Sequence, residues 1–190
     1  MTTAKNFTWW AKQKLDERLL KAAVAGDELL VKSLLALGAD PNACDIGGRT
    51  PLHSAGLSGS VEVVRALLAA GAAPGVADQY GKTPIHEASH HGHVEIIQAL
   101  LAAGADLEKA DEDGWTVLHW AVLNGNAEAV EALLSAGADP DAEDKYGDLP
   151  EDVAEGTVKN LFARRLALSE ERALLDCLPP GKAQARSSAL

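Results

Sequence analysis

The feature that most constrains this chain is a repeat with a period of 33 residues. Three glycine series and one aspartate series recur with this spacing: Gly26, Gly59, Gly92 and Gly125; Gly38, Gly71, Gly104 and Gly137; Gly48, Gly81, Gly114 and Gly147; and Asp45, Asp78, Asp111 and Asp144. Four separate series on one period do not arise by chance, and a period of about 20–50 residues is typical of stacked repeat architectures. We therefore expect each unit to bury its apolar side against its neighbours.

Each unit contains the same predicted elements. A short first helix begins at Thr50–Pro51, at Thr83–Pro84 and at Thr116–Val117, because threonine is a good N-cap and proline suits the first helical position. A second helix follows, and within 61–71 its apolar residues have the i, i+3, i+4 spacing of a helix face. A glycine ends this helix, and an extended loop with a turn leads to the next unit.

These units resemble the ankyrin repeat, which is identified by G-x-T-P-L-H at 48–53, by G-K-T-P-I-H at 81–86 and by the second half of the repeat at 92–106. The resemblance covers residues 12–168. It implies an all-α solenoid of helix–turn–helix units with projecting β-hairpin loops. The first unit lacks the Thr-Pro start, and the last has L-P-E-D at 149–152, so both are expected to be divergent caps.

The chain is divided into four segments. Residues 1–14 form a basic, aromatic N-terminal arm, and residues 15–168 form the repeat domain of about five units. Residues 169–178 form a C-terminal helix or an extension of the last repeat helix, and residues 179–190 are expected to be a disordered tail. Three roles are open for the arm: a cap over the first unit, a segment that docks into a neighbouring subunit, or a membrane-surface or organelle-targeting segment.

The charge distribution excludes several classes of protein. The net charge is −11, residues 15–156 carry eight basic and 25 acidic residues, and residues 111–152 carry twelve carboxylates with Lys145 as the one basic residue. Such a chain is not a general nucleic-acid binder, and it has no apolar run that could span a membrane. We expect a cytoplasmic protein, with a nuclear or organellar location as the alternative. Cys44 and Cys177 are expected to be reduced thiols too far apart to pair.

One motif suggests catalysis. Residues 86–90 spell H-E-x-x-H, in which two histidines on one helix face would bind zinc. His86 recurs as His53 and His119, and the resemblance implies that this histidine braces the repeat's threonine. His90 and His91 have no such explanation, which leaves a metal-binding histidine cluster as a minor alternative. We expect no enzymatic activity and no cofactor.

The resemblance implies that a protein partner contacts the hairpin tips and the exposed side of the first helices, on the concave face. The candidate partner-binding residues are Tyr80, Lys82, His90, His91, Asp113, Trp115, Trp120, Leu123, Asn124 and Tyr146. The four aromatic residues in this set fall outside the periodic aliphatic positions, as interface anchors do. Because they lie in or near the acidic segment, the expected partner has a basic segment with an apolar or aromatic anchor.

Several alternatives stay open at this point. Trp120 could pack between units while Trp115 covers a hairpin. The protein could be a monomer on its own or a subunit of a hetero-complex, and as a structural subunit it would contact its assembly through the basic ends. Residues 114–120 are also similar to the ankyrin repeats of certain histone-lysine methyltransferases, which bind methyl-lysine in an aromatic cage. Leu123 and Val153 stand where an acid and another tryptophan would complete that cage.

Overall fold

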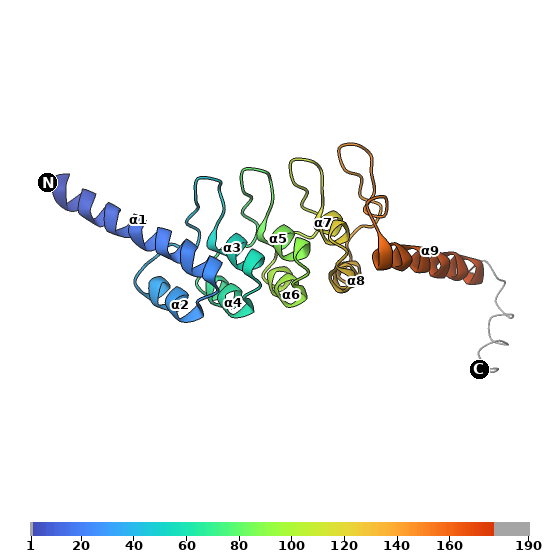
Figure 1. Ribbon diagram of the computed structural model, residues 1–190, viewed down its shortest axis with the longest axis horizontal. Coiled ribbons are helices and arrows are strands. Elements are labelled where there is room, and N and C mark those ends of the chain that lie inside the picture. Colours follow the sequence, from blue (N-terminus) through green and yellow to red (C-terminus); the bar gives the residue numbers. More distant parts are fainter. Residues whose placement is uncertain (1, 177–190) are drawn as a thin grey trace.

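The computed structural model describes the backbone of residues 2–176 and the side chains of residues 10–165 and 167. These residues form nine helices arranged in a row (Figure 1). The helices are α1 (Thr2–Ala25), α2 (Glu28–Ala36), α3 (Pro51–Ser58), α4 (Val61–Ala69), α5 (Pro84–His90), α6 (Val94–Ala102), α7 (Val117–Leu123), α8 (Ala127–Ala136) and α9 (Gly156–Asp176). The predicted all-α repeat solenoid is confirmed.

The helices form two layers. The inner helices α1, α3, α5 and α7 each contact the next inner helix along the row, and the outer helices α2, α4, α6 and α8 do the same. Long loops project from the inner-helix side (Figure 1). This arrangement places the loop tips and the exposed ends of the inner helices on one continuous surface.

The core of the stack is aliphatic and repeats with the sequence period. Leu19, Leu52, Ile85 and Leu118 are equivalent positions on the inner helices, and each is at most 1% exposed. A fully or almost fully buried alanine also recurs on each inner helix, at Ala22, Ala55, Ala88 and Ala121. The small alanine side chains let neighbouring inner helices pack closely, so each unit buries its apolar side against the next one.

An aspartate side chain holds each projecting loop in its turn. Asp78 Oδ1 accepts the backbone N–H groups of Tyr80 (2.9 Å) and Lys82 (3.0 Å), and Asp45, Asp111 and Asp144 repeat this arrangement. Backbone hydrogen bonds also join successive loops, as from Glu112 N to Tyr80 O (2.9 Å). Within residues 2–176, β pairing is limited to the isolated bridge between Ala110 and Thr116. The predicted β-hairpin loops are therefore mainly turns that are held by hydrogen bonds to aspartate side chains and to neighbouring loops.

The predicted N-terminal arm is helical over its described residues. Helix α1 is continuous from Thr2, so residues 2–14 are the first half of the first inner helix. Trp10 is 53% exposed, and the packed part of α1 begins at Leu15. The second half of α1 therefore covers this end of the stack. The side chain of Trp9 lies outside the described residues.

The last unit lacks an inner helix. Residues 150–153 form a turn, and α9 packs on the stack through the buried side chains of Val158 and Phe162. Helix α9 continues to Asp176, so residues 169–176 extend the last helix, which was one of the two predicted forms. Cys177 and the predicted tail 179–190 lie outside the described residues. None of the helices in the described part of the chain combines the length and the apolar composition that a membrane span requires.

Candidate partner-binding surface

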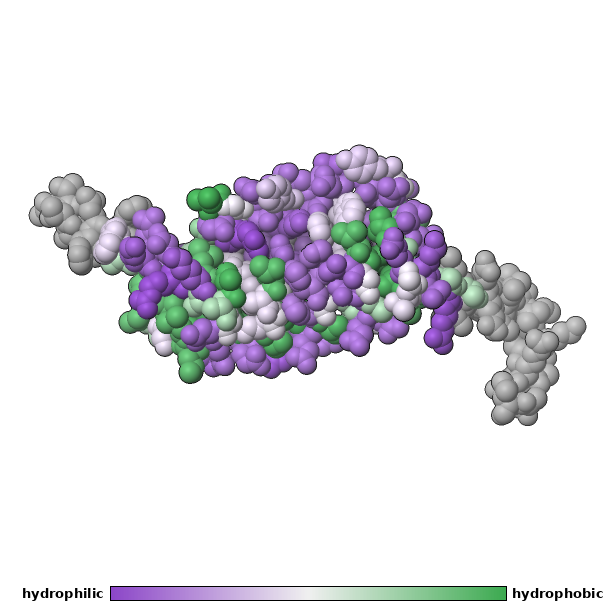
Figure 2. Space-filling model, viewed as in Figure 1, coloured by the Kyte–Doolittle hydropathy of each residue, from purple (hydrophilic) through white to green (hydrophobic). Residues whose placement is uncertain are grey.

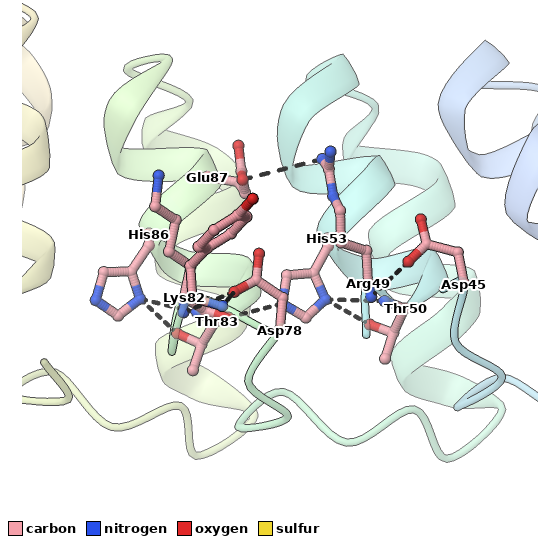
Figure 3. Close-up of polar contacts among 10 residues, drawn as sticks. Asp45, Arg49, Thr50, His53, Asp78, Lys82, Thr83, His86 and Glu87 are labelled. Carbon is pink, nitrogen blue, oxygen red and sulfur yellow. Dashed lines mark hydrogen bonds and ion pairs between the residues drawn. The ribbon is translucent and has the colours of Figure 1, made fainter. Parts of the chain in front are cut away.

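The repeat histidines hold the starts of the inner helices. His86 Nδ1 accepts the backbone N–H of Thr83 at 3.0 Å, and the Thr83 hydroxyl lies 2.8 Å from the same nitrogen (Figure 3). His53 and His119 make the same contacts with their own threonines. Because Nδ1 accepts a backbone hydrogen bond, the ring hydrogen lies on Nε2, and His53 donates it to Lys82 O of the next unit at 3.0 Å. Burial lowers the pKa of His86 to about 4, so this ring is neutral.

Two side chains of the H-E-x-x-H motif at 86–90 are engaged in other contacts. Thr83 engages Nδ1 of His86, and the Glu87 carboxylate lies 3.9 Å from the Arg49 guanidinium of the preceding unit (Figure 3). No three His, Cys, Asp or Glu side chains converge on a metal-binding position in the part of the chain that the structure describes. His86 is thus explained by the repeat, whereas His90 has no histidine counterpart in the other units.

Two tryptophans are fixed by the aspartates of the loops. Trp115 Nε1 donates to Asp144 Oδ2 at 3.0 Å, and Trp120 Nε1 donates to Asp111 Oδ2 at 2.9 Å. The two rings are half-buried, with their centroids 5.3 Å apart. Each aspartate holds a loop with one oxygen and an indole with the other, so the orientation of both rings is set before any partner arrives.

Lys82, His90 and His91 gather around Trp120. The Lys82 ammonium lies 3.6 Å from the centroid of the Trp120 ring, the distance of a cation–π contact. His90 packs edge-on against Trp120 and against His91, with centroid distances of 5.1 Å and 4.8 Å. These residues border a hollow of about 190 Å³, called the Trp120 hollow below, which is lined by Lys82, His86, Glu87, His90, His91 and Trp120.

The other candidate residues lie around this cluster. Leu123 and Asn124 are exposed at the end of α7, and Asn124 Nδ2 donates to His90 O. Tyr80, Asp113 and Tyr146 are exposed at the tips of three successive loops. The structure therefore brings together five of the candidate residues: Lys82, His90, His91, Trp115 and Trp120. The other five candidate residues lie around this cluster.

Trp115 and Trp120 have two interpretations: they are anchors for a partner, or Trp120 packs between units while Trp115 covers a hairpin. The structure bears on both. Both rings are half-buried, and Trp120 contacts Lys82 and His90 of the preceding unit, so part of its surface is used between units. In the aromatic-cage alternative, a ligand cation would sit over a tryptophan ring. Here the chain's own Lys82 ammonium is over the Trp120 ring.

The contacts that fix this surface were not predicted from the sequence. A constant offset of 29 residues joins His53 to Lys82, Trp115 to Asp144 and His119 to Asp148. This offset follows from the 33-residue period and could have indicated the tethers. A hollow of about 420 Å³ near the N-terminal end was not predicted either. It is lined by Glu17, Leu20, Lys21, Val24, Asp45 and Ser54.

Apolar side chains form separate groups on the surface. Figure 2 shows them over α1 and α2 at the N-terminal end and again near α7, with hydrophilic surface in between.

Comparison with known proteins identifies the architecture independently. A family model described as ankyrin repeats (3 copies) matches residues 19–111 and, in an overlapping match, residues 71–144. No curated protein matches the chain.

Proposed function

Because the chain belongs to the ankyrin repeat family, whose repeats are in general protein–protein interaction modules, we propose that it binds a protein partner on its concave, inner-helix surface. It acts without catalysis, as an adaptor, an inhibitor or a subunit of a hetero-complex. The observation that carries this proposal is the pair Trp115 and Trp120, which are half-buried, oriented by aspartates and still partly accessible. Ordered aromatic side chains of this kind are typical anchors of interfaces.

The charge of the same region supports a partner with a basic segment. Residues 111–152 carry twelve carboxylates and one lysine, and among the loop tips Glu112 and Asp113 are exposed beside Trp115. A negative surface speeds the association of a positively charged partner and suppresses acidic ones. An apolar or aromatic side chain of the partner would then pack on the tryptophans.

Affinity capture with mass spectrometry tests this proposal. The wild-type chain is compared with the triple variant Trp115→Ala, Trp120→Ala, Tyr146→Ala, and circular dichroism checks that the variant is still folded. The matched control replaces Leu29 and Leu37 by alanine, since both are exposed apolar side chains that lie away from this surface, in or beside the outer helix α2.

We expect the triple variant to lose a partner that both the wild type and the control retain. If the folded triple variant retains every partner, the aromatic surface is not the binding site. A partner that is lost only when residues 1–14 or 169–190 are removed indicates the alternative, a structural subunit that contacts its assembly through its ends.

A further inference from the structure

One row of equivalent positions on the inner helices is apolar except in the third unit. Val24, Leu57, His90 and Leu123 are 33 residues apart and lie near the ends of α1, α3, α5 and α7. Val24 is 55% exposed, Leu57 36% and Leu123 47%. Since α5 lies between α3 and α7, His90 is a polar group set between two exposed leucines.

Three titratable side chains face His90, and the one carboxylate among them is engaged elsewhere. From its own helix it faces His91 and Glu87, and from the preceding loop it faces Lys82. Glu87 lies 3.9 Å from Arg49, and among the described side chains no carboxylate lies within ion-pair distance of the Lys82 ammonium. Helix α7 contributes only uncharged groups here: Trp120, Leu123 and Asn124.

His90 also differs from the repeat histidines in its hydrogen bonds. His53, His86 and His119 use Nδ1 to hold a threonine, whereas His90 Nδ1 has no hydrogen-bond partner within the described residues. The fold therefore gains a ring contact with Trp120 from His90. Because Nδ1 is itself buried, His90 borders the Trp120 hollow through the other atoms of its ring.

We propose that the Trp120 hollow binds a carboxylate side chain of the protein partner, flanked by apolar side chains that rest on Leu57 and Leu123. This inference rests on the proposed function and specifies the partner at the centre of the surface. The Lys82 ammonium supplies the charge and donates hydrogen bonds to the carboxylate. A monoanion is preferred to a phosphate dianion, because the Glu87 carboxylate lines the same hollow.

The geometry of the stack sets the spacing of the flanking residues. Neighbouring helices pack about 8–10 Å apart, so Leu57, His90 and Leu123 are separated by about that distance. A polyproline II segment rises about 3.1 Å per residue with three residues per turn, which puts every third side chain on one face at about 9 Å spacing. The matching partner segment is apolar-x-x-acid-x-x-apolar, with its basic part directed toward the acidic loops of the last units.

Carboxylate binding should be coupled to proton uptake. Burial lowers the pKa of His90, and a bound anion favours its charged form, so affinity should rise as the pH falls through the range in which His90 titrates. Lys82 and His91 also face His90, and Glu87 is the one carboxylate facing it among the described side chains. The wild-type chain alone can show this dependence.

A pair of rigid peptides tests the proposal on the full chain. The probe is acetyl-Leu-Pro-Pro-Glu-Pro-Pro-Leu-amide, and its twin has glutamine in place of glutamate. Binding is followed by the Trp120 indole resonance and by calorimetry at constant ionic strength. We expect the glutamate peptide to bind roughly tenfold more tightly, as a charged hydrogen bond predicts, and more tightly at lower pH.

Two lysine variants test whether Lys82 causes the preference for the glutamate peptide. Lys82→Met should abolish the preference for glutamate, whereas Lys145→Met, at a loop tip two units away, should retain it. Equal affinity for the two peptides would overturn the proposal, and so would a glutamate preference that survives Lys82→Met. It would also be overturned by the absence of a saturable change at Trp120, or by tighter binding of the same peptide with phosphoserine in place of glutamate. The proposed function is judged separately by partner capture, so that loss of a partner in the aromatic variant together with equal peptide affinities rejects the carboxylate site alone.

Discussion

At the scale of single residues, two histidines of α5 have different roles. His86 is buried, and its Nδ1 accepts the Thr83 N–H at 3.0 Å. His90 lies one turn later at the wall of the Trp120 hollow, and its Nδ1 has no partner within the described residues. The first histidine stabilises the start of the helix, and the second packs edge-on against Trp120. The same side chain thus acquires its role from its surroundings.

Stability should fall as the pH is lowered, because the buried repeat histidines are neutral. Burial lowers the pKa of His86 from 6.5 to about 4. Between these values the unfolded chain binds a proton that the folded chain does not, so the free energy of unfolding decreases as the pH falls from about 6.5 to about 4. His86 alone should account for a loss on the order of 3 kcal/mol. Urea unfolding at a series of pH values measures it.

The variant His86→Gln is the control for this prediction. It should be less stable than the wild type at neutral pH, because the contacts with Thr83 are altered, and its decline with falling pH should be shallower. Some decrease in the free energy of unfolding with falling pH should remain in this variant, because burial also lowers the pKa of His53 and of His119. A decline as steep as that of the wild type would contradict the assignment.

Trp115→Phe should destabilise the fold through one hydrogen bond. The substitution keeps an aromatic ring and removes the indole N–H that donates to Asp144 at 3.0 Å. Hydrogen bonds to charged groups contribute about 1.5–3 kcal/mol, and since Trp115 is half-buried we expect a loss near the lower limit. Thermal unfolding checks it against Tyr146→Phe, whose side chain is exposed and whose stability should be unchanged. Equal stability of the two variants would show that the indole tether contributes nothing.

The residues of the candidate site were chosen from the sequence, but the contacts among them could not be predicted from it. Trp115 and Trp120 were identified because they stand outside the periodic aliphatic positions. The contact of the Lys82 ammonium with the Trp120 ring depends on side-chain rotamers of two different units, which the period does not determine. For the same reason the Arg49–Glu87 pair was missed.

At the scale of elements, the projecting loops are held by their neighbours. Gly81 has a positive φ of +79°, and a Cβ there would lie 2.9 Å from Glu112 N, the atom that donates to Tyr80 O. Gly104 has a positive φ of +88°, and a Cβ there would meet nothing within 4 Å. The two glycines therefore share the backbone conformation and differ in the space around them.

Gly81→Ala should be more harmful than Gly104→Ala. Both variants carry the strain of a non-glycine residue at positive φ, which is about 1–2 kcal/mol. Only Gly81→Ala also pushes apart two loops, so we expect an additional loss from the broken backbone hydrogen bond. Denaturant unfolding of the two variants compares them directly. Equal losses would mean that contact between loops does not stabilise the stack.

Helix starts were predictable where a capping residue marks them. The inner helices α3, α5 and α7 begin directly after Thr50, Thr83 and Thr116, as predicted. The first helix starts earlier than the composition suggested, because residues 2–25 contain no proline or glycine that would end a helix. In the last unit, residues 149–152 lack the threonine and histidine of the cap, and only a turn forms.

At the scale of the whole molecule, the charge of the stack should govern how fast a partner arrives. Residues 15–156 carry 25 acidic and eight basic residues. For a partner with a basic segment, raising NaCl from about 50 mM to about 500 mM should slow association much more than it changes dissociation. Surface plasmon resonance with the captured partner measures both rates. An association rate that is independent of salt would contradict a basic partner.

The central claim is that the partner covers the inner-helix surface around Trp115 and Trp120. Hydroxyl-radical footprinting of the captured complex tests it without any substitution, because it reports the whole accessible surface. The account predicts protection of Tyr80, Trp115, Trp120 and Tyr146 and no protection of Leu29 and Leu37. Protection confined to the outer helices, or to α1 and α9, with unchanged reactivity of the two tryptophans, would contradict it.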